Sequence, residues 1–167
     1  MLEYRYSKNG ALRILNGPYS GTYDFLAASG REVFAHRTLP IVAKYDCRAD
    51  DGDYHQNETE WDAGRYLQAL PADNPCRALC AEVLAISDDC RVLVEERLLG
   101  ARAEEWFKHR ESVEDMFYDA GLLPCPIHNT MDLHQSNVTQ ISSPMPDCDP
   151  PLHHIYRIHD MGYLTAP

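Results

Sequence analysis

The stretch Met131–Gln140 (MDLHQSNVTQ) carries the strongest information about the fold of this chain. It places Asp132 and Asn137 five residues apart on a polar loop, and the residues that follow alternate in a way that predicts a short strand. Roughly twenty residues later, the apolar stretch Ile155–Ile158 (IYRI) predicts a second strand that leads into Asp160. If the two strands are neighbours, an acid, an amide and a second acid form an oxygen-rich pocket, and magnesium prefers such oxygen ligands.

Two further charged residues lie upstream, on a predicted strand and a predicted helix. Pro40–Tyr45 (PIVAKY) is rich in β-branched and aromatic residues, and it places Lys44 within a strand. Asn57–Leu70 carries apolar residues near helical spacing, with Glu60 early in the helix. A lysine can neutralise phosphate charge, and a helix glutamate can hold it in position. These residue types together are typical of phosphoryl transfer.

The remaining elements make the first part of the chain rich in strands and the rest mixed. Apolar runs bounded by turn formers predict strands, and charged stretches with apolar residues at helical spacing predict helices. We expect strands over Ala11–Leu15, Thr22–Ala28, Glu32–His36 and Arg91–Leu99, a helix passing into a strand over Ala78–Ile86, and a charged helix over Ala101–Tyr118 with Phe107 on its apolar face. The predicted fold class is α+β.

In this order, the motifs resemble those of the protein-kinase-like superfamily, and they span most of the chain. The matches are a glycine-containing turn (Gly17 and Gly21 in NGPYSG), the strand lysine in VAK, the helix glutamate, the hinge-like strand RVLVEERLLG, the DLHxxN loop, and Asp160-Met161-Gly162 in place of DFG. The resemblance implies a two-lobed fold. An antiparallel N-lobe sheet with one helix would occupy residues 1–99, and a much reduced C-lobe with the catalytic loop would occupy residues 100–167.

The resemblance also implies a role for each motif residue in ATP- and magnesium-dependent phosphate transfer to a hydroxyl, here a Ser or Thr of a protein. Lys44 would contact the α- and β-phosphates and pair with Glu60, with Glu58 as the alternative partner. Asp132 would orient the acceptor hydroxyl. The metal ligands would be Asn137 and Asp160. The nucleotide would lie between the lobes, its adenine against the Val94–Leu98 hinge, and its contacts would come from Gly17, Ser20, Gly21, Lys44, Glu95 and Arg97.

Departures from the family's pattern keep two other functions open. Thr130 stands where the family has the histidine before Asp132, and the segments that build a peptide-acceptor platform have no counterpart. The alternative is therefore a pseudokinase that binds a nucleotide and regulates a protein partner, and a homodimer could supply the missing surface. His134 replaces the usual lysine, as in small-molecule kinases of the aminoglycoside-phosphotransferase kind, which is the third interpretation.

Composition disfavours several other classes of function. The 15 basic and 26 acidic residues give a formal charge of −11, which disfavours binding to nucleic acid. No apolar run approaches the ~18 residues of a membrane helix, and no secretory signal is present, so we expect a cytoplasmic protein, in a host cell if it is viral. The six cysteines contain no CxxC pair, which disfavours a zinc site. The expected ligands are ATP and Mg²⁺, and the expected partner is a protein.

Overall fold

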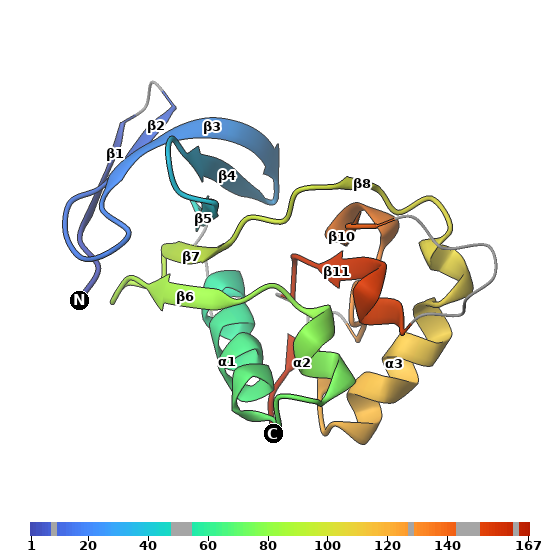
Figure 1. The fold of residues 1–167 in the computed structure, drawn as a ribbon. Helices are drawn as coiled ribbons and strands as arrows, with labels where there is room; N and C mark the ends of the chain where they lie inside the picture. The colour runs from blue at the N-terminus through green and yellow to red at the C-terminus, as the bar shows by residue number, and fades with distance from the viewer. Residues whose placement is uncertain (8–9, 48–54, 127–128, 143–150, 162–163) are drawn as a thin grey trace. The chain divides into compact units, whose positions relative to one another are not determined.

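A computed structural model describes residues 1–7, 10–47, 55–126, 129–142, 151–161 and 164–167 of the chain (Figure 1). The chain divides into two compact units. The first contains Met1–Trp61 and Glu82–Arg97, and the second contains Asp62–Ala81 and Leu98–Pro167. The predicted lobes, 1–99 and 100–167, stay a prediction, and the compact units differ from them in assigning Asp62–Ala81, Leu98 and Leu99 to the second unit.

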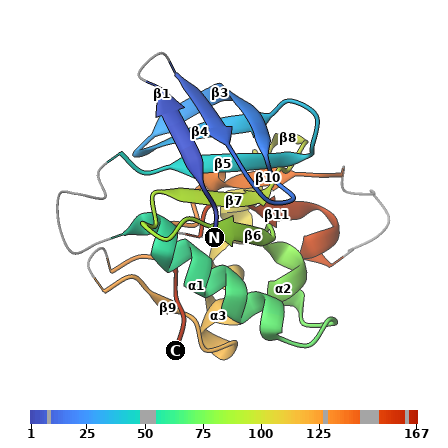
Figure 2. The same cartoon turned by 90° about the vertical axis from the view of Figure 1, so that its left-hand side faces the viewer.

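The first unit contains a seven-stranded sheet with the order β1-β2-β3-β4-β5-β7-β6, in which every neighbouring pair is antiparallel. The sheet curls into half a barrel (Figures 1 and 2). Its strands are β1 (Tyr4–Ser7), β2 (Ala11–Ile14), β3 (Gly21–Ser29), β4 (Arg31–His36), β5 (Ile41–Tyr45), β6 (Val83–Ile86) and β7 (Val92–Glu96). All the strands predicted in this part of the chain are confirmed, and β1 is an addition.

The central strands of this sheet are buried, and this explains why their sequences are apolar runs. All five residues of β5 are buried, as are the first four of β7, because both strands are covered on both faces. In β2, by contrast, Leu12 and Ile14 are buried while Ala11 and Arg13 are exposed, which is the alternation of a strand with one buried face. Tyr23 and Phe34 complete the centre of this core.

Helix α1 (Gln56–Ala69) confirms the predicted helix, with each end shifted by one residue. Its buried positions follow one face of the helix, at Asn57, Glu60, the adjacent Ala63 and Gly64, and Leu67. The first two are polar and the last three are apolar. The helix therefore buries a polar surface at its N-terminal end, and this places Glu60 in the protein interior.

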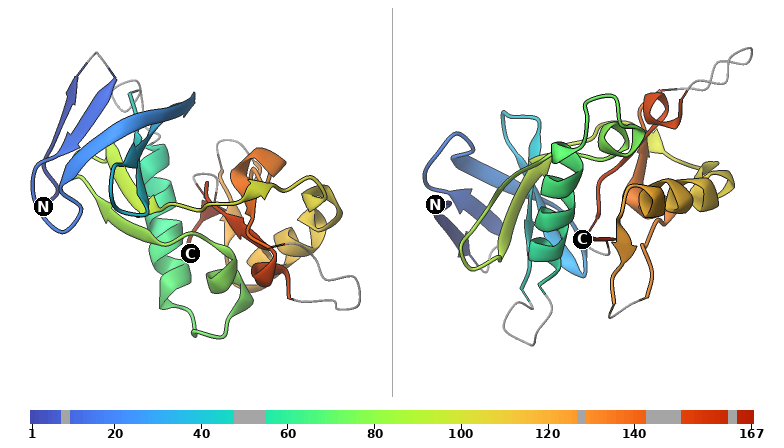
Figure 3. Two further views of the ribbon diagram at one scale, coloured as in Figure 1. Left: turned by 45° about the horizontal axis from the view of Figure 1, so that its top comes forward. Right: turned by 90° about the horizontal axis from the view of Figure 1, so that it is seen from below.

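The second unit combines two small sheets with short helices. Strands β10 and β11 lie side by side, drawn in orange and red in Figure 3, and β8 completes the order β11-β10-β8. A separate pair joins β12 to β9. The elements are α2 (Pro75–Leu79), β8 (Ala101–Arg102), α3 (Arg110–Asp119), β9 (Leu123–Pro124), β10 (Val138–Gln140), β11 (Tyr156–Ile158), β12 (Leu164–Thr165) and the 3₁₀ turns Trp106–Lys108, Gln135–Asn137 and Leu152–His154. The predicted strands at residues 138–141 and 155–158 are confirmed.

The predicted helix over Ala101–Tyr118 is wrong in its first half, because the first of these residues pair with another strand instead. Residues 101 and 102 form β8, paired with Thr139 and Gln140, and the helix begins only at Arg110. Gly100 permits this pairing, since a Cβ there would collide with the carbonyl oxygen of Gln140. Phe107, expected on the apolar face, is 72% exposed. Among the described residues, no helix is both long and apolar enough to cross a bilayer.

Candidate functional site

Lys44 lies in the middle of the first unit's sheet, on the buried strand β5. Its backbone neighbours are Val33 on β4 and Leu93 on β7. Its side chain is only 4% exposed. An ammonium group in such a place requires partners, because burial without a compensating charge costs several kcal/mol.

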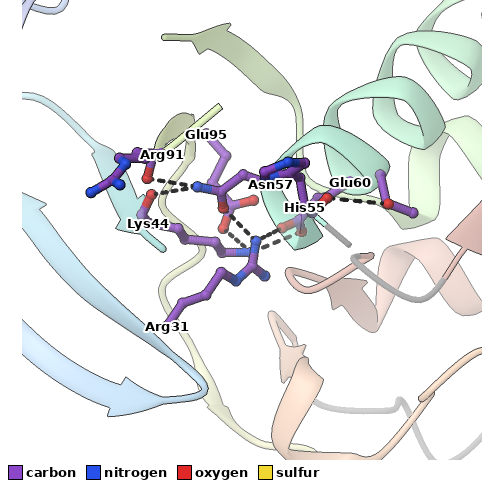
Figure 4. Close-up of polar contacts among 8 residues, drawn as sticks. Arg31, Lys44, His55, Asn57, Glu60, Arg91 and Glu95 are labelled. Carbon is purple, nitrogen blue, oxygen red and sulfur yellow. Dashed lines mark hydrogen bonds and ion pairs between the residues drawn. The ribbon is translucent and has the colours of Figure 1, made fainter. Parts of the chain in front are cut away.

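Lys44 belongs to a group of four buried charged residues, which we call the charge cluster: Arg31, Lys44, Glu60 and Glu95 (Figure 4). Lys44 Nζ lies 2.8 Å from Glu60 Oε1 and 2.9 Å from Glu95 Oε1. Arg31 Nη1 lies 2.7 Å from the second oxygen of Glu60, Oε2. When both carboxyls are ionised, the two positive and two negative charges of these four residues balance one another. Glu58, the alternative partner for Lys44, is exposed.

Asn57 ties this cluster to the backbone. Its side-chain oxygen accepts a hydrogen bond from Arg31 Nη1 at 2.7 Å. Its side-chain nitrogen donates to the carbonyl oxygens of Lys44, at 3.2 Å, and of Arg91, at 2.8 Å. The start of α1 is thus held against both β5 and the start of β7, which fixes the position of Glu60 (Figure 4). Sequence analysis did not identify Asn57 or Arg31 as members of the site.

Glu95 differs from Glu60 in how well its carboxylate is compensated. Burial raises the pKa of the Glu95 carboxyl to about 8, and nearby Glu60 adds to this, while Lys44 and Arg31 act in the opposite direction. The oxygen Oε2 of Glu95 is buried without a hydrogen-bond partner among the described residues. The sequence predicted Glu95 as a nucleotide contact in the hinge, but its side chain points to Lys44 (Figure 4).

The hinge itself follows β7. The Arg97 amide donates to the carbonyl oxygen of Pro40 at 2.9 Å, which attaches the end of this segment to the start of β5. Arg97 is half-buried and Leu99 is 67% exposed. A nucleotide contact of Arg97, and an adenine against Val94–Leu98, stay predictions.

The structure does not bring the predicted glycine turn next to Lys44. Gly17, Ser20 and Gly21 lie at the connection of β2 and β3, whereas Lys44 lies in register with Val33 and, through it, with Ala27 on β3. Ala27 lies six positions along β3 from Gly21, which corresponds to about 20 Å. Gly21 serves packing instead, because a Cβ there would collide with the imidazole ring of His36.

Among the glycine-containing turns of the described sheet, the one nearest to Lys44 in register lies between β3 and β4. Ser29 pairs with Arg31 across this turn, and Gly30 has a φ of 72°, a conformation that glycine adopts without strain. The tripeptide SGR after an apolar strand was the sequence signal for it. The segment NGPYSG was predicted to be the phosphate-binding turn instead, because it contains more turn-forming residues.

The second unit holds the predicted catalytic loop in a constrained shape. Asp132 has a φ of 48°, which is uncommon for a residue with a side chain. Asn137 Nδ2 donates to the backbone oxygen of Asp132 at 2.8 Å and to its Oδ2 at 3.2 Å. His134 Nε2 lies 3.3 Å from the other carboxylate oxygen, Oδ1. Thr130, which departs from the family's histidine, accepts a hydrogen bond from the Asp132 amide at 3.1 Å.

Asn137 and Asp160 occupy neighbouring ends of β10 and β11. Val138 pairs with Ile158, and the His159 amide donates to the carbonyl oxygen of Asn137 at 3.0 Å. Asn137 turns its amide nitrogen towards Asp132, and its amide oxygen accepts a hydrogen bond from Ser136 Oγ at 3.4 Å. That this oxygen and the Asp160 carboxylate bind a metal together stays a prediction. Gly162 of the predicted DMG segment lies outside the described residues.

These oxygen donors fit magnesium better than a transition metal. Within the described ranges, no three His, Cys, Asp or Glu side chains gather in a way that could hold a metal ion. Magnesium commonly uses one or two protein oxygens and completes its coordination with water and substrate phosphates, so a larger protein cluster is not required. Lys44 and Glu60 belong to the first unit, and Asp132, Asn137 and Asp160 to the second. Their meeting at one nucleotide stays a prediction.

Comparison with known proteins yields likenesses among solved structures, where nine chains match. No family model matches the chain, and no curated protein matches it. Among solved structures, it is similar to a co-crystal structure of WbdD and the kinase inhibitor LY294002, with a TM-score of 0.49 and 16% sequence identity. The likeness covers 87% of this chain and 34% of that chain, so the chain spans about a third of its length. The described residues form a curled antiparallel sheet with few helices, and the kinase-like lobes stay a prediction.

Proposed function

We propose that the protein is a phosphotransferase that moves the γ-phosphate of ATP to a hydroxyl group, with a Ser or Thr of a protein as the acceptor. The observation that carries the proposal is the buried ammonium of Lys44, held 2.8 Å from a helix glutamate, Glu60. Phosphoryl transfer depends mainly on positioning and charge neutralisation, so a cation in a defined place is the principal requirement.

In this proposal the charge cluster prepares Lys44 to receive phosphate oxygens. Glu60 contacts Lys44 through one carboxylate oxygen and Arg31 through the other. Because Arg31 restrains the carboxylate, Glu60 can hold the Lys44 ammonium in a fixed orientation. The β3–β4 turn at Gly30 is the glycine-containing turn closest in register to Lys44, which makes its backbone amides the better candidates for phosphate contacts.

Asp132 would accept or orient the proton of the acceptor hydroxyl. Its side chain is 26% exposed, and both carboxylate oxygens have polar neighbours, which restrict its orientation. A carboxylate positioned in this way can orient a hydroxyl for in-line attack. Asn137 and Asp160 would hold Mg²⁺, which when bound neutralises the charge on the phosphates.

The first experiment measures transfer of radiolabelled phosphate from ATP to protein acceptors by wild type, Lys44→Met and Asp132→Asn. We expect each substitution to reduce transfer by at least about a hundredfold, since each removes a charge that acts in the transition state. Lys108→Met is the matched control, because it removes the same charge from an exposed lysine paired with Glu105. Transfer that survives in both site variants would refute the proposal.

A specific observation also favours a second candidate, a nucleotide-binding module that regulates a protein partner without transferring phosphate. Lys44 is held by two carboxylates, Glu60 and Glu95, and not by one. A lysine held in this way could bind phosphate without optimal placement for transfer. Stabilisation against heat by ATP and magnesium, without any phosphate transfer, would favour this module.

A further inference from the structure

We propose that Glu95 is a proton-operated latch on Lys44: as a carboxylate it holds the ammonium, and as a neutral acid it releases the ammonium to a phosphate group. The inference rests on the proposed function, because it assigns to Lys44 the binding of a nucleotide's phosphates. Glu95 would act through Lys44 and is therefore a positioning residue. Sequence analysis placed it in the hinge and did not suggest this role.

The geometry indicates that the contact of Lys44 with Glu95, and not its contact with Glu60, is the one that can break. Both oxygens of Glu60 face cations, Lys44 at Oε1 and Arg31 at Oε2, and both contacts are shorter than 3 Å. Glu95 contacts Lys44 through Oε1 at 2.9 Å, while its Oε2 is buried with neither a hydrogen bond nor an ion pair to the described residues, and the ion pair of Oε2 to Arg31 is what distinguishes Glu60. A buried, unpartnered carboxylate oxygen is costly, and a proton on this carboxyl removes the cost.

The groups that face Glu95 are few and come from known elements. Lys44 is on β5, Glu60 on α1 and Arg31 on β4, and all three affect the Glu95 carboxyl electrostatically. The neighbouring strand β6 consists of Val83, Leu84, Ala85 and Ile86 and has no titratable side chain. The raised pKa of Glu95 is consistent with this setting, since burial outweighs the attraction of Lys44.

Charge balance links the proton to the anion. With Glu95 ionised, the two cations and two anions of the charge cluster sum to zero; with Glu95 neutral, the cluster carries one net positive charge. A phosphate oxygen is attracted to the second state and not to the first. Because coupling between two ligands is reciprocal, a proton on Glu95 strengthens phosphate binding, and bound phosphate raises the affinity of Glu95 for its proton.

The experiment measures the dissociation constant of ATP with magnesium by calorimetry, from about pH 7 to about pH 9.5, for wild type, Glu95→Gln and Glu111→Gln. In wild type, the constant rises up to about tenfold for each pH unit above about 8, because the competent, protonated fraction falls. Glu95→Gln mimics the neutral acid, and its constant stays level over this range. Glu111→Gln removes the same charge from an exposed position of α3, outside the predicted binding machinery, and follows wild type.

A measurement on wild type alone keeps the test independent of the variants' folding. Binding heats in two buffers of different ionisation enthalpy give the protons taken up per nucleotide, which we expect to approach one at about pH 9 and none at about pH 6.5. Absence of uptake at the higher pH, or equal pH slopes in wild type and Glu95→Gln, overturns the latch and leaves the proposed function standing. No nucleotide binding by any of the three proteins at any pH overturns both.

Discussion

The charge cluster and the Asp132–Asn137 loop, one in each compact unit, hold their polar groups by different means. Arg31, Lys44, Glu60 and Glu95 are each at most 4% exposed and depend on one another for compensation. On the loop, the side chains of Asp132 and His134 are 26% and 65% exposed. Water can solvate charges on the loop but not in the cluster. Substitutions in the cluster should therefore change stability, and substitutions on the loop should spare it.

The largest effect should come from breaking the charge cluster at Glu60. Glu60→Gln leaves Lys44 and Arg31 buried with one fewer counter-charge, and we expect a loss of about 3–5 kcal/mol in the free energy of unfolding. Urea unfolding followed by circular dichroism measures this loss. Glu58→Gln, in the same helix but exposed, is the control and should change stability by less than about 0.5 kcal/mol. Equal effects of the two would contradict the view that the cluster depends on mutual compensation.

The next effect is a pH dependence of stability that originates from Glu95. Its pKa of about 8 in the folded protein, against 4.5 as its ordinary value, means that the folded state binds more protons between these values. Stability should therefore fall as pH rises through this window. We expect wild type to lose roughly 2–4 kcal/mol more than Glu95→Gln between about pH 5 and about pH 9.

Urea unfolding at several pH values compares the two proteins, and the difference should vanish near pH 5. Parallel curves for wild type and Glu95→Gln would show that Glu95 has no unusual protonation in the folded state. Such a result would also remove one support for the latch, while leaving the pairing of Lys44 with Glu60 intact.

A smaller effect should distinguish backbone strain from charge at Asp132. Its φ of 48° favours glycine over alanine. We expect Asp132→Gly to be more stable than Asp132→Ala by about 1 kcal/mol, and both to lack phosphate transfer. Thermal unfolding ranks the two variants, with Asp115→Gly and Asp115→Ala as a helical control pair in which the order should reverse. The same order in both pairs would argue against a strained loop.

The smallest effect should come from the exposed pair of His134 and Asp132. The nitrogen–oxygen distance is 3.3 Å and water reaches the imidazole ring. His134→Gln should therefore change the free energy of unfolding by less than about 0.5 kcal/mol. Chemical denaturation of wild type and variant in the same buffer measures this. A loss above about 2 kcal/mol would mean that the loop, like the charge cluster, depends on its ion pair.

Local patterns were enough to predict the elements that carry the site. Apolar runs predicted β5, and helical spacing predicted α1, so Lys44 and Glu60 were assigned to the correct elements. The strand that follows Asn137, β10, and the strand that precedes Asp160, β11, were also predicted. The two strands are close in the chain, and they pair with each other. The helix over Ala101–Tyr118 failed because the sheet pairing of Ala101 and Arg102 cannot be read from composition.

By itself, the amino-acid sequence determined most of the strands and helices, and that one lysine and one helix glutamate could pair. Only the tertiary structure decided that Arg31 and Glu95 join them, and that Gly17 and Gly21 lie at a distance. The physical reason is that strands buried on both faces lose the alternation that reveals which way a side chain points. Compensation of buried charge is a long-range property, which depends on residues that meet only when the sheet has formed.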